Sequence, residues 1–200
     1  MKDRVRVLDA AIKEQAGAWL RSRGFIHDGK RAFRRASLSK ELIQIVEFQI
    51  GLGAVAGKFT VNLGVYWPKH TYIDNGVSPE QALPQHCLPE LSQRLGKLVE
   101  TPLTRFFLKL FGPRDVWWKW LFAPRDLWWR FSENESVTEL AIQDAIASIA
   151  EYGLPWLERN STELAAEGAI RALEKRKLDS NKTLGKHCRI IGSTSARVDE

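Results

Sequence analysis

Apolar positions are densest between Glu41 and Trp67, where the pattern predicts two β-strands. Residues 41–50 are crowded with Ile, Val, Leu and Phe, as in a strand that is covered on both faces. From residue 59 the pattern alternates strictly, and the side chains that share the apolar face are Phe59, Val61, Leu63, Val65 and Trp67. A short glycine-rich connection joins the two segments. We therefore expect an antiparallel hairpin at the centre of the fold.

Apolar positions spaced three and four residues apart predict helices on both sides of this hairpin. The N-terminal stripe consists of Leu8, Ile12, Ala16, Trp19 and Leu20. A second helix is expected from a capping box at Ser136–Glu139 to Gly153. A third is expected from Ser161 to about Lys177. The residues that predict a short additional helix are Leu91, Leu95 and Leu98.

These elements predict an α+β fold with an antiparallel β-sheet of about four to five strands and the N-terminal and C-terminal helices packed on one face. Residues 31–37 supply a strand that reaches residues 41–50 through a short connection, so neighbouring strands follow one another along the chain. We expect one domain over residues 1–178. Residues 179–200 are rich in Ser, Gly, Lys and Thr, and we expect a flexible tail there.

The composition is that of an ordinary globular protein, with 44% hydrophobic and 27% charged residues among 200. Its two cysteines, Cys87 and Cys188, are too few for the disulfide framework of a small secreted protein. Acidic residues at positions 3, 9 and 14 interrupt the N-terminal segment, where a signal peptide needs an apolar run. We therefore expect a cytoplasmic protein.

The segment from Pro102 to Phe131 holds five of the eight tryptophans and contains a near-repeat. Each copy follows a proline and reads Arg-Asp-x-Trp-Trp plus a basic residue, first at Arg114–Lys119 and then at Arg125–Arg130. We expect the second copy to add a strand to the sheet over residues 127–131. The first copy, within an aromatic insertion or duplication at 101–123, is a duplicated strand, a packed helix or an exposed surface. The residues through which an exposed surface would bind a partner are Trp117, Trp118, Trp120, Arg114 and Lys119. Core packing is the alternative for both copies.

Polar residues on one side of the 41–67 hairpin form a second candidate site. The residues that would line a cleft there are Glu47, Gln49, Asn62, Tyr66 and Arg130. The alternative is a solvated sheet face, or hydrogen bonds to a covering element. The sequence shows no nucleophile constellation beside them, so we assign no catalytic residue.

The sequence predicts neither a cofactor nor a metal site. Gly51–Ala56 matches a dinucleotide-binding glycine pattern after a strand, but a second strand follows where that motif needs the N-terminus of a helix. His86–Cys87 and His187–Cys188 are pairs of adjacent residues, which rarely converge on one tetrahedral ion.

The net charge of +6 is concentrated near both ends of the chain. Residues 1–35 hold ten Lys or Arg and four acids, residues 175–200 hold seven and three, and the middle is mildly acidic. The candidates for binding a nucleic acid or an anionic membrane surface are the tail and Arg21, Arg23, Arg31, Arg34 and Arg35. Solvated surface charge is the alternative.

The chain resembles the bacterial domain-of-unknown-function family 4304 (DUF4304) in five segments. In chain order they are GFIHDGKRAFRR, ELIQIVEFQI, KFTVNLGVYW, LWWRF and EYGLPWLE. The resemblance covers residues 5–160, with residues 101–123 as an elaboration. It transfers no catalytic residue, and it implies a small bacterial α+β protein of the accessory or immunity kind, which works by binding a partner.

We therefore expect a non-catalytic module that binds another protein. Association with a nucleic acid or an anionic membrane through the basic termini is one alternative. An enzyme that uses the polar face of the 41–67 hairpin is the other.

Overall fold

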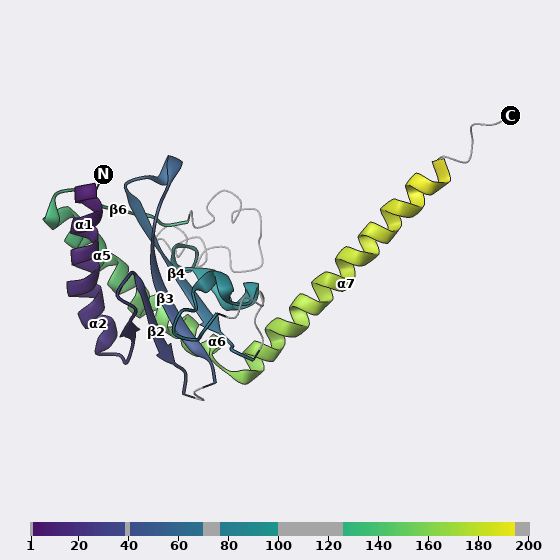
Figure 1. Cartoon of the computed structure of the whole chain (residues 1–200), viewed down its shortest axis with the longest axis horizontal. Helices are drawn as coiled ribbons and strands as arrows, with labels where there is room; N and C mark the ends of the chain where they lie inside the picture. The colour runs from purple at the N-terminus through teal and green to yellow at the C-terminus, as the bar shows by residue number, and fades with distance from the viewer. Residues whose placement is uncertain (1, 39–40, 70–76, 100–125, 195–200) are drawn as a thin grey trace, which may run out of the picture.

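Six strands form one antiparallel sheet in the computed structural model, which describes residues 2–38, 41–69, 77–99 and 126–194 (Figure 1). The strands are β1 (Ile26–His27), β2 (Ala32–Ala36), β3 (Ile43–Ile50), β4 (Lys58–Tyr66), β5 (Ser92–Arg94) and β6 (Trp129–Arg130). Their order is β1–β2–β3–β4–β5, and β6 pairs with the beginning of β4. The predicted antiparallel sheet is confirmed, and its additional strands are pieces of two or three residues.

The predicted hairpin is formed by β3 and β4, whose register places Ile50 opposite Phe59 and Glu47 opposite Asn62. β2 continues the sheet with Ala32 opposite Glu47. The second tryptophan copy adds a strand, as expected, because Trp129 and Arg130 of β6 pair with β4.

Helices precede and follow the sheet. The N-terminal helix runs without a break through α1 (Lys2–Ala11), the π-helical η1 (Ile12–Ala16) and α2 (Gly17–Arg21). The C-terminal elements are α5 (Glu135–Ser148), η6 (Ile149–Gly153), α6 (Leu154–Asn160) and α7 (Glu163–Thr194). Short 3₁₀ turns are η2 (Gly53–Val55), η3 (Pro84–His86), η4 (Pro89–Leu91) and η5 (Leu95–Lys97). Figure 1 shows α7 extending away from the remainder of the fold. No helix in the described ranges is long and apolar enough to cross a membrane.

Several predicted boundaries of the C-terminal helices are wrong. Gly153 does not end a helix, because the chain stays helical through η6 into α6. α5 begins one residue before the predicted capping box, and the Thr138 N–H closes its first turn on the carbonyl of the N-cap Asn134. The Thr138 hydroxyl also accepts from the Ser132 N–H and donates to the Ser132 carbonyl. The cap of α7 is Thr162, whose hydroxyl accepts from the Ala165 N–H.

The last helix is also longer than the sequence predicts. α7 continues to Thr194 instead of ending near Lys177. Whether residues 179–200 form a flexible tail stays a prediction, as does the single domain over residues 1–178. The short helix expected around Leu91, Leu95 and Leu98 is absent from this described segment, because β4 offers a free edge and Ser92–Arg94 pair with it as β5.

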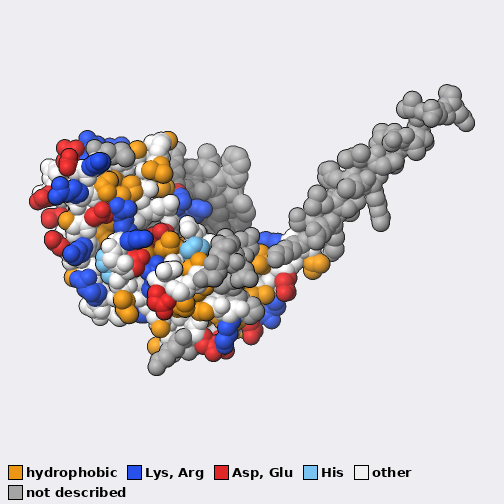
Figure 2. All heavy atoms as spheres, in the orientation of Figure 1, with side chains coloured by type: hydrophobic (Ala, Val, Ile, Leu, Met, Phe, Trp, Pro, Cys, Tyr) orange, Lys and Arg blue, Asp and Glu red, His pale blue; other side chains and the backbone are white. Residues whose placement is uncertain are grey.

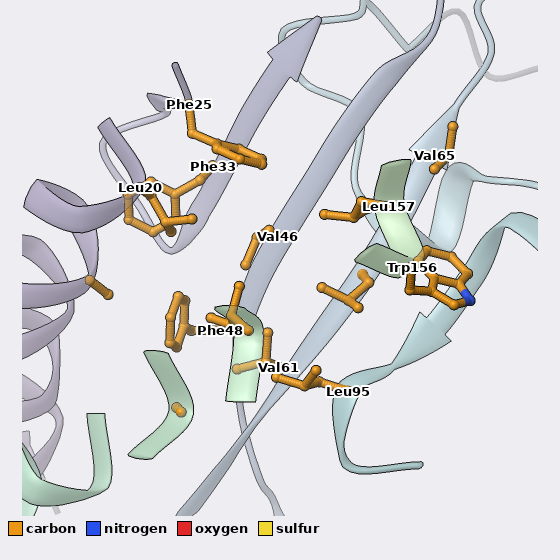
Figure 3. Packing of buried hydrophobic residues seen from close by; sticks show 14 of the residues in the cluster. Leu20, Phe25, Phe33, Val46, Phe48, Val61, Val65, Leu95, Trp156 and Leu157 are labelled. Atoms are coloured by element: carbon orange, nitrogen blue, oxygen red, sulfur yellow. The ribbon is translucent and has the colours of Figure 1, made fainter. Parts of the chain in front are cut away.

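The main core lies between the helices and one face of the sheet. The alternating residues Phe59, Val61, Leu63 and Val65 are fully buried there, as the sequence predicts. Figure 3 shows Phe33, Val46 and Phe48 from the neighbouring strands with Leu20 and Leu157 from the helices. Burial of this much apolar surface is the main stabilising contribution to the fold.

The opposite face of the sheet carries a smaller core, and the segment 77–91 covers it. Ile45 and Tyr66 of the sheet pack there against Ala82 and Cys87. The segment approaches closely because β4 has a glycine at this point. A Cβ atom on Gly64 would lie 2.8 Å from the Cys87 Sγ and 2.9 Å from the Pro84 Cα.

Candidate functional site

The part of the sheet that segment 77–91 leaves uncovered forms a cleft of about 870 Å³. It lies on the side opposite the main core, where β2 begins and β3 ends. We call it the sheet cleft, and its polar lining residues are Asp28, Lys30, Arg31, Arg34, Glu47, Gln49, Glu80 and Gln81. The exposed side chain of Leu52 stands at its edge.

Glu47 and Gln49 line the floor of the sheet cleft, and Asn62 on the neighbouring strand β4 joins them in a hydrogen-bonded trio. Asn62 Nδ2 donates to Glu47 Oε2 at 3.1 Å and to Gln49 Oε1 at 2.9 Å. The hairpin produces this arrangement, because Glu47 lies opposite Asn62 and side chains two apart on β3 share a face. The structure therefore brings together three of the five residues that the sequence proposes for a cleft.

The other two proposed residues lie elsewhere. Tyr66 is buried in the smaller core under segment 77–91, and its hydroxyl donates to the Val77 carbonyl at 2.9 Å. Arg130 is exposed on β6 opposite Lys58 and does not line the sheet cleft. Sequence alternation correctly gives the face of Tyr66, but it does not show that the 77–91 segment covers that end of the sheet.

An ion pair between Arg34 and Asp28 borders the sheet cleft. Arg34 is 8% exposed, and its Nη1 lies 3.1 Å from Asp28 Oδ2. Its Nε donates to the Ala82 carbonyl at 2.6 Å, which ties segment 77–91 to β2. Partial burial would raise the pKa of Asp28, but hydrogen bonds from the Lys30 N–H and from Arg34 outweigh it and hold that pKa below its usual value.

A second depression of about 370 Å³ adjoins the sheet cleft on the side of β1. We call it the apolar hollow, because Ile26, Ala36, Ile43 and Pro79 contribute to its lining. Ile26 is 76% exposed there. The residues that line both the apolar hollow and the sheet cleft are Asp28, Arg34 and Glu80. Sequence reasoning missed Asp28 and Glu80, because they come from a turn and a loop without a regular pattern.

A cluster of Arg94, Asp126 and Trp128 lies next to Asn62, on the side of β5. Arg94 lies opposite Asn62 in the register of β5 with β4 and forms an ion pair with Asp126. The Trp128 indole N–H donates to the same carboxylate oxygen at 3.3 Å, and the guanidinium of Arg94 lies 5.1 Å from the Trp128 ring centre. The Arg-Asp-x-Trp-Trp repeat supplies Asp126 and Trp128, but nothing in the sequence pairs them with Arg94.

The candidate partner-binding residues of the first tryptophan copy lie outside the described residues. They are Trp117, Trp118, Trp120, Arg114 and Lys119. In the second copy, Trp129 is buried, its ring centre lies 5.6 Å from that of Phe59, and its N–H donates to Asp144 at 2.7 Å. Trp129 therefore joins β6 and α5 to the main core.

Four of the five arginines that the sequence proposes for binding a nucleic acid or a membrane have partners within the described fold, and Arg34 with its Asp28 partner is one of them. Arg31 makes two hydrogen bonds to Asp9, at 2.6 and 3.0 Å. Arg23 lies 3.8 Å from the Trp19 ring centre. Arg35 donates through Nε and Nη2 to Gln44 Oε1, at 2.9 and 2.6 Å. These contacts lower the number of basic groups that remain for a phosphate-rich partner.

The histidine and cysteine of the first His-Cys pair have structural environments. His86 Nδ1 accepts a hydrogen bond from the Leu83 N–H at 3.0 Å. Burial raises the pKa of the Cys87 thiol, which lies against β4. Among the described residues, no group of three or more His, Cys, Asp or Glu is arranged to hold a metal. The absence of a cofactor stays a prediction.

The family model described as "Domain of unknown function (DUF4304)" matches residues 16–159. This range contains the whole sheet and both depressions, and it stops one residue before the end of α6. No curated protein and no solved structure matches the chain. Because the match covers well over half of the 200 residues and agrees with the five segments that suggested it, the chain belongs to the DUF4304 family.

Proposed function

We propose that this protein is a non-catalytic module that binds a segment of another protein across the sheet cleft and the apolar hollow. The observation that carries the proposal is that the two depressions share Asp28, Arg34 and Glu80. An apolar subsite next to a polar one matches the mixed side chains of a protein segment. The Arg34–Asp28 pair between them is held by β2 and segment 77–91, so the surface is preorganised.

The charges of this surface favour a protein over a nucleic acid. Both basic and acidic side chains line the sheet cleft, and Figure 2 shows basic, acidic and apolar side chains intermingled on the visible face. A site for a phosphate backbone needs several cations that are free to contact phosphates. Here Arg31 and Arg34 are already paired with Asp9 and Asp28.

The floor of the sheet cleft favours recognition over catalysis. In the hydrogen-bonded trio, Glu47 is the one ionisable group, because the amides of Gln49 and Asn62 neither accept nor release protons near neutral pH. General acid–base catalysis would require a positioned group that exchanges a proton with the substrate and a second group to complete the cycle. The enzyme alternative therefore has weaker support than binding.

Site-specific photo-crosslinking in the native host tests the proposal. A benzophenone amino acid replaces Leu52 at the sheet cleft or Ile26 at the apolar hollow. Leu140 on α5 is the matched control, because Leu52 and Leu140 are 78% and 65% exposed. We expect the same partner protein to be crosslinked from Leu52 and Ile26, with the adduct mapped by mass spectrometry, and not from Leu140. No adduct at either site, or equal adducts at all three positions, would refute the proposal.

A further inference from the structure

We infer that the bound segment places a basic side chain, with arginine as the best fit, on Glu47 in the floor of the sheet cleft. This inference rests on the proposed function and adds the chemistry of the partner. Its basis is the set of charges in the sheet cleft that remain unpaired after the ion pairs of the fold are assigned.

The guanidinium groups that line the sheet cleft are occupied. Arg31 binds Asp9 with two hydrogen bonds, a geometry that uses the planar fork of the guanidinium. Arg34 is buried, paired with Asp28 and bonded to the Ala82 carbonyl. Neither is free to bind an acidic ligand without breaking these contacts.

The two glutamates that line the sheet cleft, unlike its arginines, form no salt bridge within the described part of the chain. Glu47 and Glu80 form no salt bridge with any residue that the structure describes, and Lys30 is the lining cation in the same condition. Glu80 accepts a hydrogen bond from the Ser78 side chain and is attracted by Arg34. Among the described residues that line the sheet cleft, Glu47 is therefore the carboxylate without a cation beside it. Lys30 is exposed to solvent, whereas Glu47 is half-buried in the floor, so a buried basic ligand would interact most strongly with Glu47.

The geometry of the trio prepares Glu47 for a cation. Asn62 Nδ2 has two hydrogens, and both are directed to Glu47 Oε2 and Gln49 Oε1. Glu47 Oε1 has no hydrogen-bond partner in the described part of the chain. The oxygens of Glu47 and Gln49 can therefore accept hydrogen bonds from a ligand, and Asn62 has no further N–H that would point at that ligand. A guanidinium carries several donors in one plane and matches this set better than a single ammonium does.

Titration of ¹⁵N-labelled protein with blocked single amino acids tests the inference by NMR. The probes are the N-acetyl, N-methylamide derivatives of arginine, glutamate and leucine. We expect the arginine probe to shift the backbone amide signals of Glu47 and Gln49 and to bind about tenfold more tightly than the glutamate probe, as a charge-assisted hydrogen bond implies.

The decisive variant is Glu47→Gln, because the new amide can still accept from Asn62 and the fold is retained. We expect this change to weaken arginine binding about tenfold. Glu139→Gln, at an exposed position of α5, is the matched control and should leave the affinity unchanged. Equal binding of arginine and glutamate, or no effect of Glu47→Gln, would overturn the inference.

The leucine probe separates this inference from the proposed function. Binding in the apolar hollow, seen as shifts at Ile26 and Ile43, together with no arginine binding at Glu47, would refute the basic partner while supporting a protein-binding face. Binding of neither probe, together with failed crosslinking from Leu52 and Ile26, would refute both.

Discussion

Replacement of Gly64 by alanine tests how segment 77–91 is held on the sheet. The new Cβ would meet the Cys87 Sγ at 2.8 Å and the Pro84 Cα at 2.9 Å, both far inside normal van der Waals contact. Because one of these atoms belongs to the backbone, a side-chain rotation cannot relieve both contacts. We therefore expect segment 84–87 to shift away from β4.

The magnitude follows from two opposing effects. Overpacking at a well-packed site costs about 1–3 kcal/mol. Replacement of a strand glycine by alanine recovers about 0.5–1 kcal/mol, because the unfolded chain loses less conformational freedom on folding. Taking the middle of each range, we expect Gly64→Ala to lower the free energy of unfolding by about 1 kcal/mol.

Urea denaturation followed by circular dichroism measures this change. Gly168→Ala is the matched control, because Gly168 lies inside α7 and a Cβ atom there would meet nothing within 4 Å. We expect this change to raise the free energy of unfolding by about 0.5–1 kcal/mol. Adding Cys87→Ala to Gly64→Ala should recover part of the loss, since one of the two close contacts disappears. An unchanged stability of Gly64→Ala, or strict additivity of the two substitutions, would contradict the close approach.

Three further substitutions test the packing of the fold. Gln44→Leu removes the acceptor of Arg35 from a position that is 3% exposed, so we expect urea denaturation to show a loss of about 2–3 kcal/mol, and a loss below about 0.5 kcal/mol would contradict this role. Trp129→Phe removes the indole donor to Asp144, and we expect thermal unfolding to report a loss of about 2 kcal/mol, with no further loss when Asp144→Asn is added. Burial raises the pKa of the Cys87 thiol above that of a cysteine in the unfolded chain. The neutral thiol therefore stabilises the fold fully below pH ~8.5, and this stabilisation declines at higher pH by up to about 1.4 kcal/mol per pH unit. Cys87→Ala should therefore flatten the dependence of unfolding free energy on pH between about 8.5 and 9.5, and an unchanged slope would refute the assignment.

The sequence predicts the central sheet well because its signal is local. Strict alternation from Phe59 to Val65 defines one buried face, and a one-residue shift of register would expose all of these side chains. The same alternation places Glu47, Gln49 and Asn62 on the opposite face, so the floor of the sheet cleft is predictable from the pattern. The order of the strands then follows from short connections along the chain.

The remaining features depend on contacts between distant segments. The burial of Tyr66 comes from segment 77–91, whose prolines predict a loop but not its position. The pairing of Arg34 with Asp28 and with the Ala82 carbonyl joins β2 to a turn and to that loop. A glycine at position 153 favours the end of a helix, yet the chain continues as a helix there because tertiary packing outweighs local helix propensity.

The close passage at Gly96 has a consequence for the redesign of this chain. A Cβ on Gly96 would lie 2.3 Å from the Leu127 nitrogen, so the backbone at residue 96 and the backbone at residue 127 run in contact. The two ends of the stretch between these residues thus meet at one point of the domain, and the length of that stretch has little influence on the sheet. A designer can therefore graft a new segment between these two backbone positions, because the residues that line the two depressions all lie between positions 26 and 83.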